Sequence, residues 1–353
     1  MSLPSSRPTM RDVAERAGVS PKTVSNVLTG RAPVREPTRL RVEQAMRELD
    51  FVPNLSARGL RNGRSGVIGL AQPDLRAAFS ASMTHAVVEA AHARGLVVQV
   101  EETAAEPGRE HDLVTRARTH LIDGMILNPV RLQDSVVEHL DHLPPVVLIG
   151  EVEQHRTDRV FINSHAAARD AVRHLLASGA RRIVALGGAE SGSGLDKATQ
   201  GQRLRGYLAG LAEAQLPAPP ELQIEVPEWT IAGGAEGMRE ILQQGAEFDA
   251  VLAFTDSIAL GAMHELRSWG ARLPEDVLVC GFDDVEHARF AGTPLTTIGF
   301  DHQDYANAAL DLLTSRMRDR TLPPREEEDP YELIARASTE GPPAGFSGKN
   351  SEN

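Results

Sequence analysis

The stretch TMRDVAERAGVSPKTVSNVLTG, residues 9–30, decides what the N-terminal part of the chain folds into. Thr9 and Asp12 have the spacing of a capping box, in which each side chain bonds the backbone N–H of the other residue. Gly18 is placed to end this first helix in the left-handed conformation that glycine adopts without strain. The pattern therefore predicts a short helix over residues 9–17 that is followed at once by a tight turn.

A second helix follows this turn almost immediately. Ser20 is its candidate N-cap, and Pro21 occupies the first helical position, where the missing N–H is not needed. Two short helices joined through a glycine turn are typical of a helix-turn-helix. A third helix, over residues 37–49, is expected to close the core through its apolar side chains, which are Leu40, Val42, Ala45, Met46 and Leu49.

The second helix carries polar side chains that could reach bases. Such a helix usually enters the major groove with its N-terminal residues facing base edges. Asn26 could pair with adenine, Lys22 favours guanine acceptors, and Ser25 is a third polar candidate. The alternative is that these side chains only solvate a surface helix.

The charge is distributed unevenly along the chain. The whole chain has a formal net charge of −12, which alone argues against a nucleic-acid partner. Residues 1–65, however, hold 12 Lys and Arg against 6 Asp and Glu, a net of +6, and the other 288 residues hold 25 against 43, a net of −18. A basic head on an acidic body points to an anionic partner for the head.

The segment between head and body is only weakly helical. Ala57, Leu60 and Arg61 favour a helix, whereas Gly59 disfavours it. We expect a linker that becomes helical only when bound. Leu60 is an apolar side chain among arginines, as insertion into a minor groove requires, and the alternative is that it packs on the neighbouring domain.

From residue 66 onward, strand-like and helical runs alternate. Continuous apolar strands between helices indicate buried parallel sheets in an α/β architecture, here two doubly wound lobes with a cleft between them. The expected fold is thus a small all-α helix-turn-helix head on an α/β core of two lobes. The predicted strands are residues 67–71, 96–100, 124–127, 146–150, 183–188, 250–254 and 277–282.

Polar residues follow several of these strands. Ligands of such folds bind outside the carboxyl ends of the strands, so these residues are candidate ligand contacts. Asp256 has an alternative role that we favour, as the cap of the helix that follows it. The strand-end segments are residues 72–74, 128–129, 151, 187–188, 255–256 and 283–284.

Signals of catalysis, metal binding or membrane insertion are missing. The glycine-rich run at residues 187–197 lacks the spacing of a phosphate loop, and Cys280 lies in an apolar strand, which favours an inert thiol. The acidic run Glu326–Asp329 is expected to be a solvated loop. Apolar runs stay well short of the roughly 18 residues of a membrane span. We expect a cytoplasmic protein that is not an enzyme, with no cofactor, no metal and no membrane contact.

Residues 9–30 and 38–70 together closely resemble the lactose/galactose-repressor (LacI/GalR) family of bacterial transcription regulators. The resemblance implies a three-helix DNA-binding head, a hinge helix at about residues 54–62, and a ligand-sensing core that dimerises. The domains implied are a head over 1–51, a hinge and linker over 52–65, a core over 66–340 and a disordered tail over 341–353.

The resemblance also assigns roles to single residues. Arg203 and Asp283 match effector-contacting residues, Phe79 matches an aromatic near the pocket, and Thr255 falls where the family often has Asn. Glu151 falls where many members have another ligand-contacting residue after an Asp, so the pair Gly150-Glu151 departs from the pattern. The DNA-contacting residues implied are Pro21, Lys22, Thr23, Ser25, Asn26, Asn54, Ala57, Leu60 and Arg61.

The leading hypothesis is a ligand-responsive regulator, with repression as its expected action. It would bind a pseudo-palindromic operator in double-stranded DNA as a homodimer, with a tetramer left open, and a sugar or other metabolite would bind between the lobes. The first alternative is a periplasmic-type solute-binding protein, which the helix-turn-helix and the absent signal peptide oppose. The second is an α/β enzyme with a DNA-binding appendage, for which no catalytic constellation is present.

Overall fold

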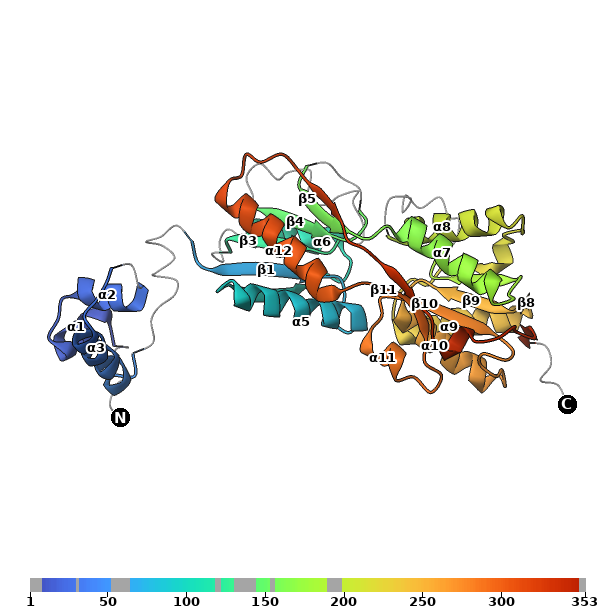
Figure 1. The fold of residues 1–353 in the computed structure, drawn as a ribbon, viewed down its shortest axis with the longest axis horizontal. Coiled ribbons are helices and arrows are strands. Elements are labelled where there is room, and N and C mark those ends of the chain that lie inside the picture. The colour runs from blue at the N-terminus through green and yellow to red at the C-terminus, as the bar shows by residue number, and fades with distance from the viewer. Residues whose placement is uncertain are drawn as a thin grey trace. The chain divides into compact units, whose positions relative to one another are not determined.

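The structure is a computed structural model, and it describes residues 8–29, 32–51, 64–117, 122–129, 144–152, 156–188 and 199–348. The chain divides into two units, Met1–Ser65 and Gly66–Asn353, which are an all-helical head and an α/β core (Figure 1). The predicted hinge contacts Asn54, Ala57, Leu60 and Arg61 lie outside the described residues, as does most of the glycine-rich run.

The head consists of α1 (Met10–Ala17), α2 (Pro21–Thr29) and α3 (Glu36–Glu48). The capping box of α1 is confirmed, because the Thr9 backbone N donates to Asp12 Oδ2 at 2.7 Å and the Thr9 hydroxyl accepts from the Asp12 backbone N at 3.4 Å. Gly18 ends α1 at φ 64°, as predicted. The local signals predicted for the two ends of α1 are therefore both present.

A small apolar cluster holds the three head helices together. Leu40, expected in this core, is instead 52% exposed, so that prediction is wrong. The reason is helical geometry, because a residue two positions before Val42 points to the opposite side of α3. Met46 and Leu49 pack on the cluster from its edge, and its buried members are Val13, Ala14, Ala17, Val24, Val42 and Ala45.

The first lobe of the core is a six-stranded parallel sheet in the order β12-β5-β4-β3-β1-β2. Helices α5 (Ala78–Ala93) and α12 (His302–Arg318) pack against each other on this lobe, and α6 (Pro107–Ala117) follows β2. The strands are β1 (Val67–Gln72), β2 (Val97–Glu102), β3 (Gly124–Leu127), β4 (Val146–Ile149), β5 (Asp158–Phe161) and β12 (Glu326–Glu328).

The second lobe is a six-stranded sheet in the order β13-β11-β10-β9-β6-β7, parallel except for β13. Figure 1 shows α7 (Ser164–Ala177) and α8 (Thr199–Glu213) on one face, with α9 (Ile231–Gln244) and α10 (Asp256–Ser268) on the other. The strands are β6 (Ile183–Leu186), β7 (Gln223–Ile224), β9 (Ala250–Ala253), β10 (Leu278–Phe282), β11 (Thr296–Gly299) and β13 (Glu332–Ile334), and short helices cover Pro220–Leu222, Glu286–Arg289 and Ala337–Thr339.

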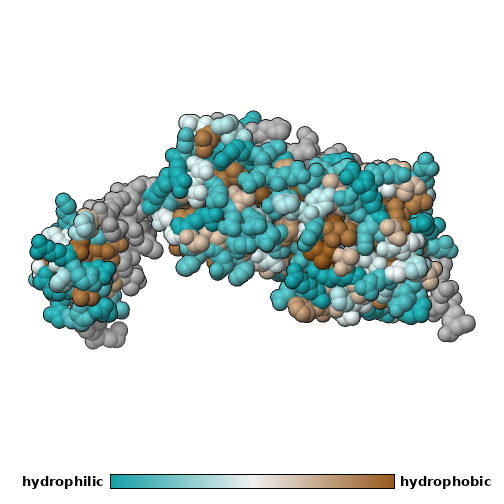
Figure 2. All heavy atoms as spheres, in the orientation of Figure 1, coloured by the Kyte–Doolittle hydropathy of each residue, from teal (hydrophilic) through white to brown (hydrophobic). Residues whose placement is uncertain are grey.

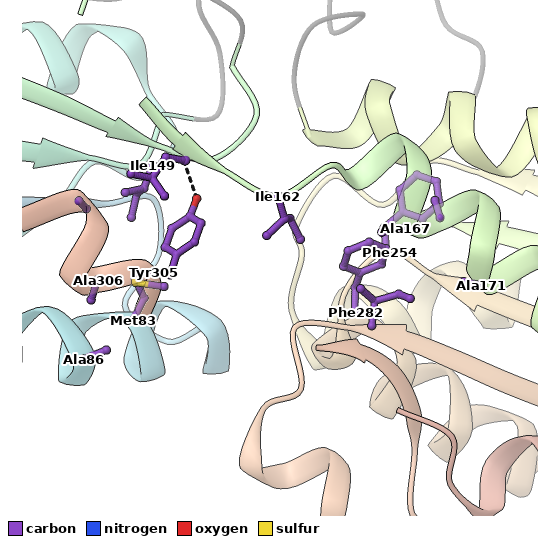
Figure 3. Close-up of a cluster of buried hydrophobic side chains, with 14 of the residues drawn as sticks. Met83, Ala86, Ile149, Ile162, Ala167, Ala171, Phe254, Phe282, Tyr305 and Ala306 are labelled. Atoms are coloured by element: carbon purple, nitrogen blue, oxygen red, sulfur yellow. Dashed lines mark hydrogen bonds between the residues drawn. The ribbon is translucent and has the colours of Figure 1, made fainter. Parts of the chain in front are cut away.

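Side chains alternate across both sheets, as strand geometry requires. In β9, Leu252 joins the cluster under α7 and α8, whereas Val251 joins the cluster under α9 and α10. The first of these clusters extends through both lobes (Figure 3), with Met83, Ile149 and Tyr305 in the first lobe and Phe254 and Phe282 in the second. The predicted doubly wound α/β core is therefore confirmed.

The chain passes between the two lobes three times. It crosses after β5, again between β11 and α12, and a last time between β12 and β13. Ile162 lies on the first of these segments (Figure 3). The Asp329 backbone N on the third segment donates to Phe161 O at 2.8 Å, which joins this segment to the end of β5, where the first segment begins. Each lobe is thus assembled from sequence-distant pieces.

Two predictions about the C-terminal part of the chain are wrong. The acidic run Glu326–Asp329 is not a loop, because residues 326–328 form β12 and pair with β5. The predicted disordered tail is ordered over residues 341–348, where β14 (Phe346–Ser347) pairs with β8 (Glu247–Phe248). The half-buried Phe346 packs on the apolar cluster of the second lobe, and this contact stabilises the position of residues 341–348.

The surface seen in Figure 2 is mostly hydrophilic, with apolar residues in small groups. Within the described ranges, every helix is too short or too polar to cross a lipid bilayer.

Candidate functional site

Glu151 projects from the carboxyl end of β4, in the first lobe. Gly150, just before it, has φ 99°, which only glycine adopts easily, so the chain turns sharply here. The buried Tyr305 hydroxyl accepts from the Gly150 backbone N at 2.8 Å and donates to Val160 O at 2.7 Å. Tyr305 thereby links β4 to β5 and fixes the turn that presents Glu151.

Arg203 lies on α8, in the second lobe, and is 5% exposed. Its Nε donates to the Ser164 hydroxyl at 3.3 Å, and its Nη1 donates to Phe254 O. Ser164, the first residue of α7, in turn donates to Glu151 Oε1. A continuous chain of hydrogen bonds therefore runs from Arg203 through Ser164 to Glu151 and joins the two lobes.

Asp283 completes this cluster from the carboxyl end of β10. Its Oδ1 lies 3.5 Å from Arg203 Nη2, and both side chains are almost fully buried. Its backbone has φ 105°, a conformation that costs free energy for any residue other than glycine and that is enriched at functional sites. The Arg203 guanidinium also lies 3.7 Å from the centre of the Phe282 ring and 5.8 Å from that of Trp229.

The two carboxyl groups of this cluster hold their protons unusually tightly. Burial raises the pKa of Glu151 to about 7, because the contacts with Arg203, Ser164 and Arg159 only partly offset desolvation. Burial likewise raises the pKa of Asp283 to about 7, with Arg203 opposing the shift. Carboxyls whose pKa values are shifted by desolvation beside a specific charge partner are candidates for a functional site.

This burial predicts a pH-dependent stability. The ordinary pKa of Glu151 is 4.5, so between about pH 4.5 and 7 the folded protein holds a proton that the unfolded chain has lost. The free energy of unfolding therefore falls as the pH rises through this window, because folding then requires the uptake of a proton. We expect Glu151→Gln to gain about 2–3 kcal/mol of unfolding free energy relative to the native protein between pH 5 and pH 8, measured by urea unfolding.

The matched control is Glu89→Gln on α5, which removes the same charge from an exposed position. Its stability relative to the native protein should change little over the same pH range. Parallel pH profiles for Glu151→Gln and the native protein would contradict the assignment of a buried, proton-holding carboxyl.

The predicted capping role of Asp256 is wrong. Thr255 is the N-cap of α10, since its hydroxyl accepts from the Ile258 backbone N at 3.1 Å. Asp256 is fully buried instead, with Oδ1 accepting from the Thr297 hydroxyl at 2.7 Å and Oδ2 from the Val285 backbone N at 2.9 Å. It therefore fixes the loop that carries Asp283, and burial raises its pKa.

Phe79 lies at the contact between the lobes, in the first turn of α5. Its ring centroid is 6.1 Å from that of Phe300, on the second crossing segment, and 5.7 Å from that of His302, the first residue of α12. Phe79 also packs on the two large apolar clusters of the core, and its predicted role as a ligand contact stays a prediction.

Gln72 and Asn128 were predicted only as residues at the ends of strands. Ser164 and Tyr305 were not predicted as site residues. Asn128 Nδ2 donates to Gln72 Oε1 at 3.0 Å, at the carboxyl ends of β3 and β1. Their place after apolar strands was the signal that could have singled them out. Ser164 and Tyr305 carry no such signal, because they belong to helices that begin after crossing segments.

The candidate DNA-contacting side chains of the head lie on α2. Pro21 and Lys22 are exposed, and Thr23, Ser25 and Asn26 are partly exposed, whereas Val24 on the opposite side is buried in the core. The Ser20 hydroxyl accepts from the Thr23 backbone N at 3.1 Å and caps the helix. Pro21 and Lys22 on this face of α2 are therefore exposed to solvent, where a partner could reach them.

Metal and thiol chemistry find little support in the described residues. Among them, no group of three or more His, Cys, Asp or Glu side chains is arranged to hold a metal ion. Cys280 is fully buried in β10, and burial raises its pKa, so the thiolate is disfavoured.

A helix-turn-helix head joined to a two-lobed core, with a buried polar cluster across the lobes, defines a DNA-binding regulator with a ligand-sensing body. Comparison with known families agrees with this class. Residues 9–54 match the bacterial regulatory proteins of the lacI family, and residues 172–339 match a periplasmic binding protein-like domain.

Individual relatives resemble the chain over nearly its whole length. The transcriptional repressor CytR of Escherichia coli is 31% identical over 95% of this chain and 97% of its own, and the repressor PurR of Aliivibrio salmonicida is 28% identical over 94% and 98%. The lac repressor dimer bound to operator and the anti-inducer ONPF is 27% identical, with a TM-score of 0.83 over 95% of this chain and 100% of that one. A CelR–cellobiose complex is 29% identical, with a TM-score of 0.69 over 94% and 100%.

The chain belongs to the LacI family of bacterial regulators. It is a ligand-responsive, DNA-binding transcription regulator, and the solute-binding alternative is disfavoured.

Proposed function

We propose that the protein is a transcriptional repressor that binds a pseudo-palindromic operator as a homodimer and responds to a small molecule held between its lobes. The observation that carries this proposal is the hydrogen-bonded cluster of Glu151, Ser164 and Arg203, because it joins both lobes through buried polar groups. A ligand that replaces these bonds changes the relative position of the lobes. Such a change couples a ligand site to a distant DNA site.

The proposed effector contacts are Glu151, Arg203, Thr255 and Asp283, with Phe79 at the contact between the lobes. The relatives support an effector of metabolite size, since one structure is a complex of CelR with cellobiose. A regulator of this kind works without catalysis, in the cytoplasm and on nucleoid DNA.

The proposed DNA contacts are the polar residues of α2 and the hinge residues. In the relative that is bound to operator, the lac repressor acts as a dimer, and two copies of the head would likewise meet two half-sites here. Leu60 is proposed to enter the minor groove between them. The residues proposed are Pro21, Lys22, Thr23, Ser25, Asn26, Asn54, Ala57, Leu60 and Arg61.

Operator binding tests this proposal. An operator is selected from random duplexes with the full chain, and affinity is measured by fluorescence anisotropy at several salt concentrations. Asn26→Ala should weaken binding to the selected operator by about 1–3 kcal/mol, because a paired amide is lost. Binding to unrelated duplex should change little.

The matched control is Gln44→Ala, which removes an exposed amide from α3. It should leave operator affinity within about 0.5 kcal/mol of the native value. Equal losses for the two variants, or a failure to select any duplex, would refute the assignment of α2 as the recognition helix.

A further inference from the structure

The turn after β10 contains two consecutive residues with left-handed backbone conformations. Asp283 has φ 105° and Asp284 has φ 49°. Such conformations cost free energy for residues with a Cβ, and they persist only where the surrounding contacts hold them. Asp283 is also the proposed effector contact of this turn. The contacts that hold the turn therefore decide where the Asp283 carboxyl lies.

Backbone hydrogen bonds hold the turn on both sides of Asp284. The Asp283 backbone N donates to Ile298 O, in β11, at 2.8 Å. The Val285 backbone N donates to Asp256 Oδ2 at 2.9 Å. The Asp284 side chain, between these two bonds, connects the turn to a third segment.

That third segment follows β13 and carries Arg336. Arg336 Nη2 donates to Asp284 Oδ1, and Nη1 donates to Leu295 O, just before β11, at 2.9 Å. The Arg336 backbone N donates to the Thr296 hydroxyl at 2.8 Å, so both ends of the residue are fixed. The Arg336 and Asp284 side chains are only 14% and 9% exposed, which limits screening of their charges by water. A planar guanidinium in this place joins the turn and the strand in one geometry.

The second oxygen of the Asp284 carboxylate bonds a different arginine. Arg289 Nη2 donates to Asp284 Oδ2 at 2.8 Å, but 58% of the Arg289 side chain is exposed. Exposed ion pairs stabilise a protein little, because water screens the charges and the long side chain loses freedom. Arg289 and Arg336 thus contact the same carboxylate, and we expect only Arg336 to hold the turn.

We propose that Arg336 is a positioning residue of the effector site, which holds the strained turn in place through Asp284. The Asp283 carboxyl then stays beside Arg203, with Asp283 Oδ1 at 3.5 Å from Arg203 Nη2. Strand β13 comes directly after the third crossing between the lobes, so Arg336 also connects this crossing to the effector turn. This inference rests on the proposed effector site.

The proton of Asp283 reports where its carboxyl lies. Burial raises the pKa of Asp283 from 3.8 to about 7, and Arg203 opposes the shift. Between about pH 4.5 and 6.5, the folded protein therefore keeps a proton on Asp283 that the unfolded chain has released. A relaxed turn would bring this carboxyl to water, so its pKa would fall and the folded protein would lose the proton as well.

Other titratable groups that face Asp283 must be separated from it. They are Arg203 on α8, Glu151 after β4 and Asp256 on α10, and His302 of α12 is hydrogen-bonded to the Asp283 backbone. Asp283→Asn keeps the shape of the protonated carboxyl and removes its titration. Comparing each chain with and without Asp283→Asn therefore isolates the proton of Asp283.

The first test counts the protons released on unfolding, from urea unfolding of the full chain between about pH 4.5 and 6.5. Fluorescence of the two tryptophans follows the core, where both lie. In the native background, Asp283→Asn should lower the count by about one proton. In Arg336→Met it should lower the count by less than about half a proton, because Asp283 is then already ionised in the folded protein. Arg289→Met, the matched control, should keep the difference of about one.

Lower stability of Arg336→Met by itself does not support the proposal, since any structural arginine gives that result. A difference of about one proton in Arg336→Met would overturn the proposal, because the turn would then be held without this arginine. If Arg336→Met does not fold, Arg336→Lys takes its place. Lysine keeps the charge but cannot bond the turn and the strand together, and a proton difference equal to that of Arg289→Met would overturn the proposal in the same way.

The second test connects the turn to the effector. Monosaccharides, disaccharides and nucleosides are screened by thermal shift, and the compound that stabilises the native chain most is titrated by calorimetry. Arg336→Met should bind it about tenfold more weakly, and Arg289→Met should bind it within about twofold of the native affinity. Equal affinities of the two variants would overturn the effector role of Arg336. Binding that leaves operator affinity unchanged, or no binding by any compound, would count against the proposed function, and the proton count would still decide whether Arg336 holds the turn.

Discussion

Replacing Arg203 with Met is expected to lower the unfolding free energy by about 3–5 kcal/mol at pH 8 and to abolish the response of operator binding to effector. Glu151 and Asp283 would then lie buried and ionised without the guanidinium that they share. At pH 5 both carboxyls are protonated in the folded protein, so the loss should be clearly smaller. Urea unfolding at the two pH values measures this difference.

Arg205→Met is the control for this prediction. Arg205 lies on the same helix, two residues away, and is exposed. Its replacement should cost at most about 0.5 kcal/mol at either pH and should leave the ligand response intact. A loss for Arg203→Met that is the same at pH 5 and pH 8 would show that the two carboxyls do not depend on Arg203.

Replacing Arg316 with Met is expected to lower the unfolding free energy by about 3–5 kcal/mol, yet to preserve the response of operator binding to effector. Asp158, fully buried in β5, accepts from Arg316 Nε at 2.9 Å and from Nη2 at 2.8 Å, and Arg325 is its other ionic partner. Burial alone would raise the pKa of Asp158, but the hydrogen bonds from the two arginines outweigh it and hold the pKa below its usual value. Its ionised form therefore stabilises the fold, and this stabilisation is lost as the pH falls through that lowered pKa.

The exposed Arg318→Met, at the end of the same helix, is the matched control and should change stability by about 0.5 kcal/mol or less. Adding Asp158→Asn to Arg316→Met should recover part of the loss, because the uncompensated charge is removed. Failure of the double variant to recover any stability would show that packing, and not charge, accounts for the effect.

The elements that the sequence predicted well are those with local signals. Thr9, Asp12 and Gly18 mark the two ends of the short helix α1, and the capping bonds form as expected. Apolar strands such as β3 and β4 were found because both of their faces are buried. The resemblance to the LacI family, and the two-lobed fold that it implied, were likewise confirmed.

The elements that were missed depend on contacts between distant residues. Strand β5 begins with the polar pair Asp158-Arg159. These two residues can be buried because Asp158 pairs with Arg316 and Arg159 pairs with Glu326, and both partners lie near the end of the chain. The run Glu326–Glu328 is polar throughout and is a strand only because it pairs with β5. The order of residues 341–348 has the same origin, since Phe346 pairs with Phe248.

Only part of the candidate site was predicted, because the rest of it also depends on contacts between distant residues. Glu151, Arg203 and Asp283 were each predicted singly, and the fold brings them into one cluster. Ser164, which connects them, follows a crossing segment, and its role depends on how the two lobes meet. The position of Ser164 in the sequence does not show how the two lobes contact each other.

The three crossings between the lobes also govern the order in which the protein can be built on the ribosome. The head is complete within the first 65 residues and can fold while the rest is still being made. The first lobe must wait for α12, because Leu310 and Leu313 of that helix pack in its apolar core. A nascent chain thus carries a finished DNA-binding head long before its sensing body can close. Messages truncated ahead of α12 would yield a head attached to an exposed apolar sheet, which is a substrate for cellular proteolysis.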